Sequence, residues 1–123
     1  MTLTRDEAAR AFAERMGWTF EIGGPWQPLD KRQIGIGPAD KYGSFKESIP
    51  IPAPDAPLDE ALAFVGRIAE AIKTNVVAVD MRHHEFKDVG PIAVTFKHEN
   101  GWCYSDDLCH AALLAALAAL ASR

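Results

Sequence analysis

The sequence has 123 residues, of which 48% are apolar and 24% charged, and its net charge at pH 7 is −4. This composition is ordinary for a globular chain, and the length suits one domain, residues 1–123, with a core of its own. The acidic balance and the lack of a Lys/Arg run disfavour bulk nucleic-acid binding, which depends on a basic face. We expect no membrane span, because the most apolar stretch, residues 111–121, is short and rich in alanine.

Charged residues near the start argue for a cytoplasmic protein. Arg5, Asp6 and Glu7 stand where a secretory signal would have its apolar core. Two cysteines without such a signal are typical of reduced thiols, so we expect no disulfide.

The first elements are a helix and a strand. Thr4 and Glu7 have the spacing of a capping box, apolar residues follow at helical spacing, and Gly17 is placed to end the helix. Residues 18–22 alternate between apolar and polar side chains, which predicts a strand with one buried face.

Residues 24–57 are expected to form a long loop. Residues 33–37 are interpreted as a short edge strand and residues 48–51 as a second extended piece. So long a connection indicates either a functional loop or a secondary-structure element that the pattern does not reveal.

A central helix is predicted over residues 55–73. Asp55 is interpreted as its cap and Pro57 as a first-turn residue. Apolar side chains at steps of three and four predict one buried stripe, formed by Leu58, Leu62, Val65, Ile68, Ala69 and Ile72.

Three strands and a final helix complete the chain. The apolar runs 76–79, 92–96 and 102–104 predict an antiparallel meander, the last two joined by the hairpin signal Asn100-Gly101. Ser105 or Asp106 is expected to cap an Ala/Leu-rich helix, whose apolar surface indicates either burial in the core or a homodimer contact. The predicted fold is α+β, with an antiparallel sheet of three to five strands packed by three helices.

Several motifs together resemble the phage ABA-sandwich domain family of small phage and prophage proteins. They are Met16-Gly17-Trp18, Gly24-Pro25-Trp26, the Pro-bounded central helix and the closing run from Leu108 to Ala115. The chain departs from the family in the aromatic positions of the central helix, and His110 stands where the family has a basic residue. The resemblance implies a helix–sheet–helix sandwich and a protein located in the cytoplasm of a bacterial host cell. The family gives no settled activity. It also implies the tasks of such proteins, namely binding a host or phage protein or countering a defence system.

Four residues of the meander are candidate metal ligands. His83 and Glu85 would share one face of a strand and His84 the other, and a turn would bring His98 opposite them. Three such ligands with an open position suit hydrolytic zinc, although the spacing matches no His-Glu-x-x-His motif. The preferred interpretation is a solvated polar strand end, without a metal or cofactor, and a metal-dependent hydrolase is the alternative.

The remaining candidates for chemistry have structural interpretations beside them. Cys103 and Cys109 suit buried apolar positions, whereas a nucleophilic Cys109 paired with a histidine would gain from a place in the first helical turn. Gly35-x-Gly37 matches part of a phosphate-binding turn, but no helical pattern follows it.

The long loop combines basic and aromatic residues, which makes it the predicted binding surface. Its candidate binding residues are Trp26, Lys31, Arg32, Lys41, Tyr42, Phe45 and Lys46. The aromatic side chains could anchor a partner or hold the loop to the core. The leading hypothesis is non-catalytic binding of an acidic host or phage protein, and the alternative is a protein that sequesters a nucleotide signal.

Overall fold

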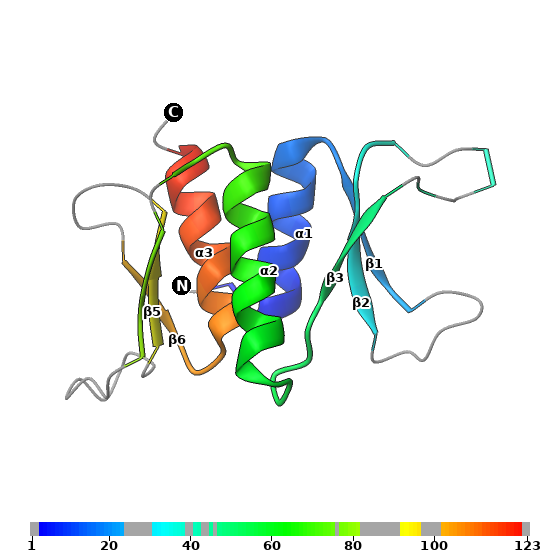
Figure 1. The fold of residues 1–123 in the computed structure, drawn as a ribbon. Helices are drawn as coiled ribbons and strands as arrows, with labels where there is room; N and C mark the ends of the chain where they lie inside the picture. Colours follow the sequence, from blue (N-terminus) through cyan, green and yellow to red (C-terminus); the bar gives the residue numbers. More distant parts are fainter. Residues whose placement is uncertain are drawn as a thin grey trace.

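Three helices lie side by side between two small antiparallel sheets (Figure 1). The computed structural model describes residues 3–23, 31–38, 41–42, 45, 47–75, 77–81, 92–96 and 102–121. No helix among these residues is long and apolar enough to cross a membrane.

The first helix, α1 (Arg5–Met16), has the predicted capping box. The Thr4 hydroxyl accepts the Glu7 N–H, and the Glu7 carboxylate accepts the Thr4 N–H at 2.9 Å. Gly17 ends the helix in the left-handed conformation, with φ of 75°, which costs a residue without a Cβ very little. Ala8, Ala9, Phe12 and Ala13 form its buried face.

Sheet A contains β1 (Thr19–Ile22), β2 (Arg32–Gly35) and β3 (Ser48–Ile51), in the order β1-β2-β3. Phe20 pairs with Ile34, and Ile34 with Ile49, so one face of the sheet packs on the helices. The prediction of an edge strand at residues 33–37 is wrong, because β2 is the centre of the sheet. The Pro/Gly-rich stretch therefore contains both strands that complete the sheet begun by β1.

The second helix, α2 (Leu58–Ala71), follows Pro57, which is its N-cap and forms no side-chain cap; the prediction that Asp55 caps it is wrong. The predicted buried stripe is only partly right, since Leu58 is 50% exposed and Leu62 43% exposed. The helix instead turns Phe64 inward, toward β3, alongside Val65 and Ile68. The partner strand β3, which the helix sequence cannot reveal, decides this rotation.

Sheet B is the predicted meander. It contains β4 (Ala78–Asp80), β5 (Ile92–Thr95) and β6 (Cys103–Ser105), in the order β4-β5-β6 with antiparallel pairing. Val79, Val94 and Cys103 form a row across it that packs against the core. The predicted Asn100-Gly101 turn lies outside the described residues.

The third helix, α3 (Leu108–Ala121), is capped by Asp107, whose carboxylate accepts the Cys109 N–H at 2.9 Å. The predicted caps, Ser105 and Asp106, are therefore wrong. The helix contacts α1, α2, β5 and β6, so it is buried on most sides. Its small alanine side chains allow these close approaches. The contacts within one chain are therefore enough to explain why the surface of α3 is apolar.

The helices run in the same direction, and each meander of three strands returns the chain to the end where the next helix begins (Figure 1). Arg5 beside Asp107 and Arg15 beside Leu120 show this parallel arrangement for α1 and α3. The predicted α+β class is confirmed. The strands divide between two outer sheets, so the layer order differs from the helix–sheet–helix sandwich that the resemblance implies.

Candidate functional site

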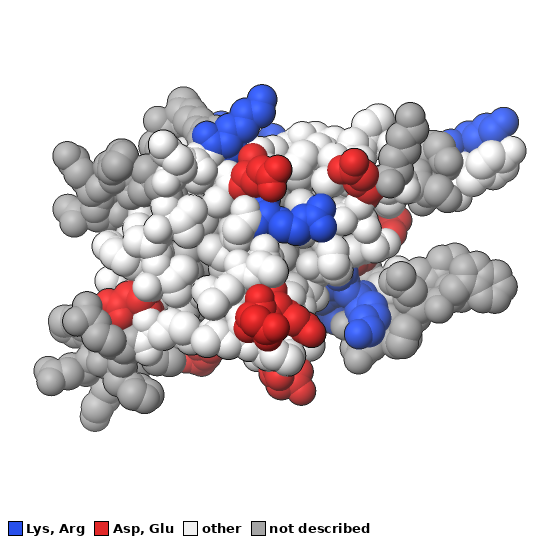
Figure 2. All heavy atoms as spheres, viewed as in Figure 1, with Lys and Arg blue, Asp and Glu red and all other residues white. Residues whose placement is uncertain are grey.

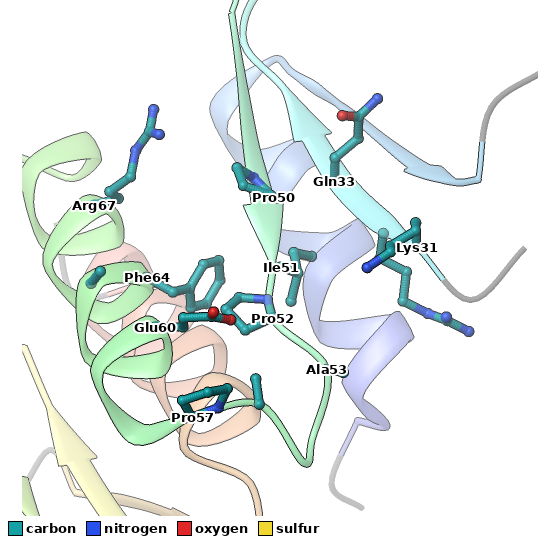
Figure 3. Close-up of a pocket in the computed structure, with 13 residues that line it drawn as sticks. Lys31, Gln33, Pro50, Ile51, Pro52, Ala53, Pro57, Glu60, Phe64 and Arg67 are labelled. Carbon is teal, nitrogen blue, oxygen red and sulfur yellow. The ribbon is translucent and has the colours of Figure 1, made fainter. Parts of the chain in front are cut away.

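A groove of about 670 Å³ lies between α2 and sheet A (Figure 3). Residues 50–53, at the end of β3, form its floor, and α2 and β2 provide the walls. The volume falls within the range of roughly 300–1,000 Å³ that is usual for ligand sites. The groove is therefore the best-formed candidate site among the described residues.

The floor of the groove is apolar and rigid. Pro50 and Pro52 flank Ile51, and β3 is an edge strand, where proline is tolerated because no ladder hydrogen bond is lost. A proline ring has no N–H, so this edge cannot form a continuous backbone ladder with an added strand. Contacts with side chains must therefore dominate the recognition of any ligand.

The walls carry three cations and one carboxylate, although the chain as a whole is acidic. Lys31 and Arg32 belong to the β2 wall. Arg67 and Glu60 project from α2, across the groove from Lys31 (Figure 3). Arg32 is paired with Asp6, with its Nε 2.7 Å from Oδ1 and its Nη2 3.2 Å from Oδ2. Lys31, Arg67 and Glu60 form no ion pair with any other described residue.

A second hollow of about 450 Å³ adjoins the groove at Arg32 and Ala53. Arg5 lines it and ties three elements together: its Nε lies 2.5 Å from Asp107 Oδ2, and its Nη2 donates to the Pro52 carbonyl. The floor of the groove is thus anchored to the start of α1 and the start of α3.

Of the five predicted binding residues that the structure describes, two line the groove, Lys31 and Arg32. Lys41 and Tyr42 are exposed between β2 and β3, with the Lys41 ammonium 5.0 Å from the centre of the Tyr42 ring, and neither lines the groove. Phe45 packs on Gly35, where an added Cβ would lie 2.6 Å from three ring carbons. Its ring therefore holds the loop to the outer face of sheet A.

Several predicted residues cannot be placed. Trp26 and Lys46 lie outside the described residues, as do the candidate metal ligands His83, His84, Glu85 and His98. Among the residues that the structure does describe, no group of three His, Cys, Asp or Glu side chains could hold a metal ion.

The structure opposes a nucleophilic role for Cys109. Burial, and to a smaller degree the Asp107 carboxylate, raises the pKa of its thiol to about 11, so the reactive thiolate is scarce at neutral pH. His110 is used elsewhere, with Nδ1 2.8 Å from Ser105 Oγ and Nε2 2.8 Å from the Leu3 carbonyl. The Ser105 hydroxyl accepts the Asp107 N–H, so these residues order the start of α3.

The Gly35-x-Gly37 segment is not a phosphate-binding turn. Gly35 is a strand residue covered by the Phe45 ring, and Gly37 adopts a φ of 80° in the turn after β2. No helix opens directly after these glycines in the described segments, so the backbone N–H groups of a helix start are missing.

The α2 wall and the proline floor have no functional signature in the sequence. Glu60, Arg67 and Phe64 are ordinary helix residues in the sequence, and Pro50 and Pro52 look like loop residues. The one usable signal was that residues 60, 63, 64 and 67 share a helical face.

Comparisons with family models, with curated proteins and with solved structures gave no match to this chain. The groove itself therefore supplies the argument about function.

Proposed function

We propose that this protein is a non-catalytic binding protein that captures an acidic segment of another protein in the groove between α2 and β3. The resemblance to small phage proteins leads us to expect a host or phage protein as the partner. The observation that carries the proposal is an apolar proline floor beside two cations, Lys31 and Arg67, that lack an ion-pair partner among the described residues.

The charge distribution favours an anionic partner. Asp6 already neutralises Arg32, whereas Lys31 and Arg67 are exposed and remain available to a ligand. Over α2 and sheet A, basic and acidic side chains stand close to one another on the surface (Figure 2). Each ion pair formed at such a rim contributes up to about 1 kcal/mol, and salt screens it. The apolar floor contributes the burial that makes such weak pairs useful.

The geometry favours a peptide segment over a nucleotide. A base would need an accessible aromatic face on which to stack, but Phe64, the one aromatic side chain among the described residues that line the groove, is only 3% exposed. The floor offers proline rings and Ile51, which suit aliphatic side chains of a segment.

Selection from a library of random twelve-residue peptides tests the proposal. The wild-type protein should enrich peptides that combine acidic and aliphatic residues. Arg67→Glu should weaken the affinity for these peptides by about tenfold, since the attraction between Arg67 and an acidic side chain becomes a repulsion. Lys73→Glu is the matched control, because Lys73 follows the same helix, is exposed and lies outside the groove.

Two results would count against the proposal. Equal binding of the selected peptides by the wild-type protein and by Arg67→Glu would show that the groove does not recognise them. A thermal shift with linear or cyclic nucleotides that Arg67→Glu abolishes, without any peptide enrichment, would favour a nucleotide-binding protein instead.

A further inference from the structure

The α2 wall of the groove carries both signs of charge at a fixed spacing. Arg67 and Glu60 are seven residues apart, which is two helical turns or about 10 Å along the axis. Both line the groove (Figure 3), and neither forms an ion pair with another described residue. A ligand lying along this wall meets a positive group at one end and a negative group at the other.

The shape of the groove suits an extended chain. α2 packs directly against β3, and Phe64 and Ile51 are buried at their contact, so the groove is closed beneath. A helix, about 10–12 Å across, would touch such a seam with a single ridge, whereas an extended segment can lie along it. At about 3.3 Å per residue, the 10 Å between the charges corresponds to about three residues of extended chain.

We infer that the groove selects a short extended segment with an acidic and a basic side chain four residues apart, a spacing that keeps both on the same side of the chain, in preference to a uniformly acidic segment. This inference rests on the proposed function and specifies the ligand class of the same site. The acidic side chain faces Arg67, the basic side chain faces Glu60, and the apolar residues between them cover Pro50, Ile51 and Pro52.

Charge complementarity at Glu60 is what separates the two ligand classes. A second acidic side chain opposite Glu60 would lose an ion pair and gain a like-charge contact. Lys31, on the opposite wall, attracts acidic residues in both ligands and favours the diacidic one wherever it reaches the second carboxylate, so the preference for the mixed segment requires that the contact with Glu60 outweigh it.

Two fluorescent, end-blocked peptides provide the test: Glu-Leu-Val-Leu-Lys, the mixed peptide, and Glu-Leu-Val-Leu-Glu, the diacidic peptide. Fluorescence anisotropy should show that the wild-type protein binds the mixed peptide about fivefold more tightly. Glu60→Gln should abolish this preference, and Glu60→Lys should reverse it. Glu60 is exposed, so both variants are expected to fold, and urea unfolding verifies this.

The outcomes separate the inference from the proposed function. Equal binding of the two peptides, or tighter binding of the diacidic one, by the wild-type protein overturns the inference. If Arg67→Glu still weakens that binding, the proposed function stands. If the wild-type protein binds neither peptide but the library selection enriches other acidic peptides, the inference alone fails.

Discussion

Replacing Gly35 by alanine should destabilise the protein through a single side chain, the Phe45 ring. A methyl group at position 35 would lie 2.6 Å from three carbons of that ring. Carbon atoms prefer separations of about 3.5–4.0 Å, so the overlap is roughly 1 Å. Gly35 is in the centre strand of sheet A, with no positive φ, and its backbone conformation therefore tolerates alanine.

The cost follows from what the ring can do. If it stays, overpacking costs about 1–3 kcal/mol. If the ring swings away, the protein loses the free energy of packing a partly buried Phe side chain. That loss is smaller than the roughly 3 kcal/mol that full burial of a Phe contributes. Either way we expect Gly35→Ala to lower the free energy of unfolding by about 1–2 kcal/mol. In a Phe45→Ala background the same change should stabilise the protein by about 0.5–1 kcal/mol, because glycine weakens strand interiors.

Urea unfolding of the wild-type protein, both single variants and the double variant forms a complete cycle. With an m-value of about 1–3 kcal/mol per molar urea, the single variant should shift the midpoint downward by about 1 M. A loss of stability that is equal in both backgrounds would show that Phe45 does not cover Gly35. Phe45 would then be available to anchor a partner, as the alternative interpretation of the loop aromatics holds.

The remaining predictions concern residues at the ends of the helices. Thr4→Ala should reduce the free energy of unfolding by about 1 kcal/mol, measured in urea. Hydrogen bonds from Thr4 hold the pKa of the Glu7 carboxyl below its ordinary value. The contribution of the Glu7 carboxylate to the free energy of unfolding is therefore present at neutral pH and lost as pH falls through that lowered pKa. Glu7→Gln should be more destabilising at pH 7 than at pH 3, and an equal effect at both would contradict this. Cys109, with its pKa raised to about 11, should resist iodoacetamide in the native Cys103→Ser variant and react in urea. Since only the unfolded state ionises this thiol between about pH 9 and pH 11, stability should decline there more in the wild-type protein than in Cys109→Ala.

Much of the local structure could be predicted because it depends on neighbouring residues. The capping box of Thr4 and Glu7 and the left-handed Gly17 need only a few adjacent residues, and both are present as expected. The meander of sheet B follows from three short apolar runs, and its register places Val79, Val94 and Cys103 in one row. Errors at the other helix starts were small, since Asp107 caps α3 where Ser105 or Asp106 was expected.

The candidate site was predicted less well, because its walls come from distant parts of the chain. Basic loop residues pointed to Lys31 and Arg32, but Arg67 and Glu60 belong to a helix whose outer face has no special pattern. The grouping of Lys41 and Tyr42 with them assumed that residues of one loop gather in space, whereas β2 and β3 separate their segment from the groove.

The sequence alone determined the α+β class, the order of the three helices and the antiparallel pairing of sheet B, because alternation and capping act over short distances. Only the tertiary structure decided that the strands form two sheets on opposite sides of the helices. It also decided the rotation of α2, which exposes Leu58 and Leu62 and buries Phe64. The physical reason is that burial depends on which surfaces meet: α2 turns toward β3 because that edge strand offers Ile51 and Pro50, with Pro52 directly after it, and the same contact creates the groove.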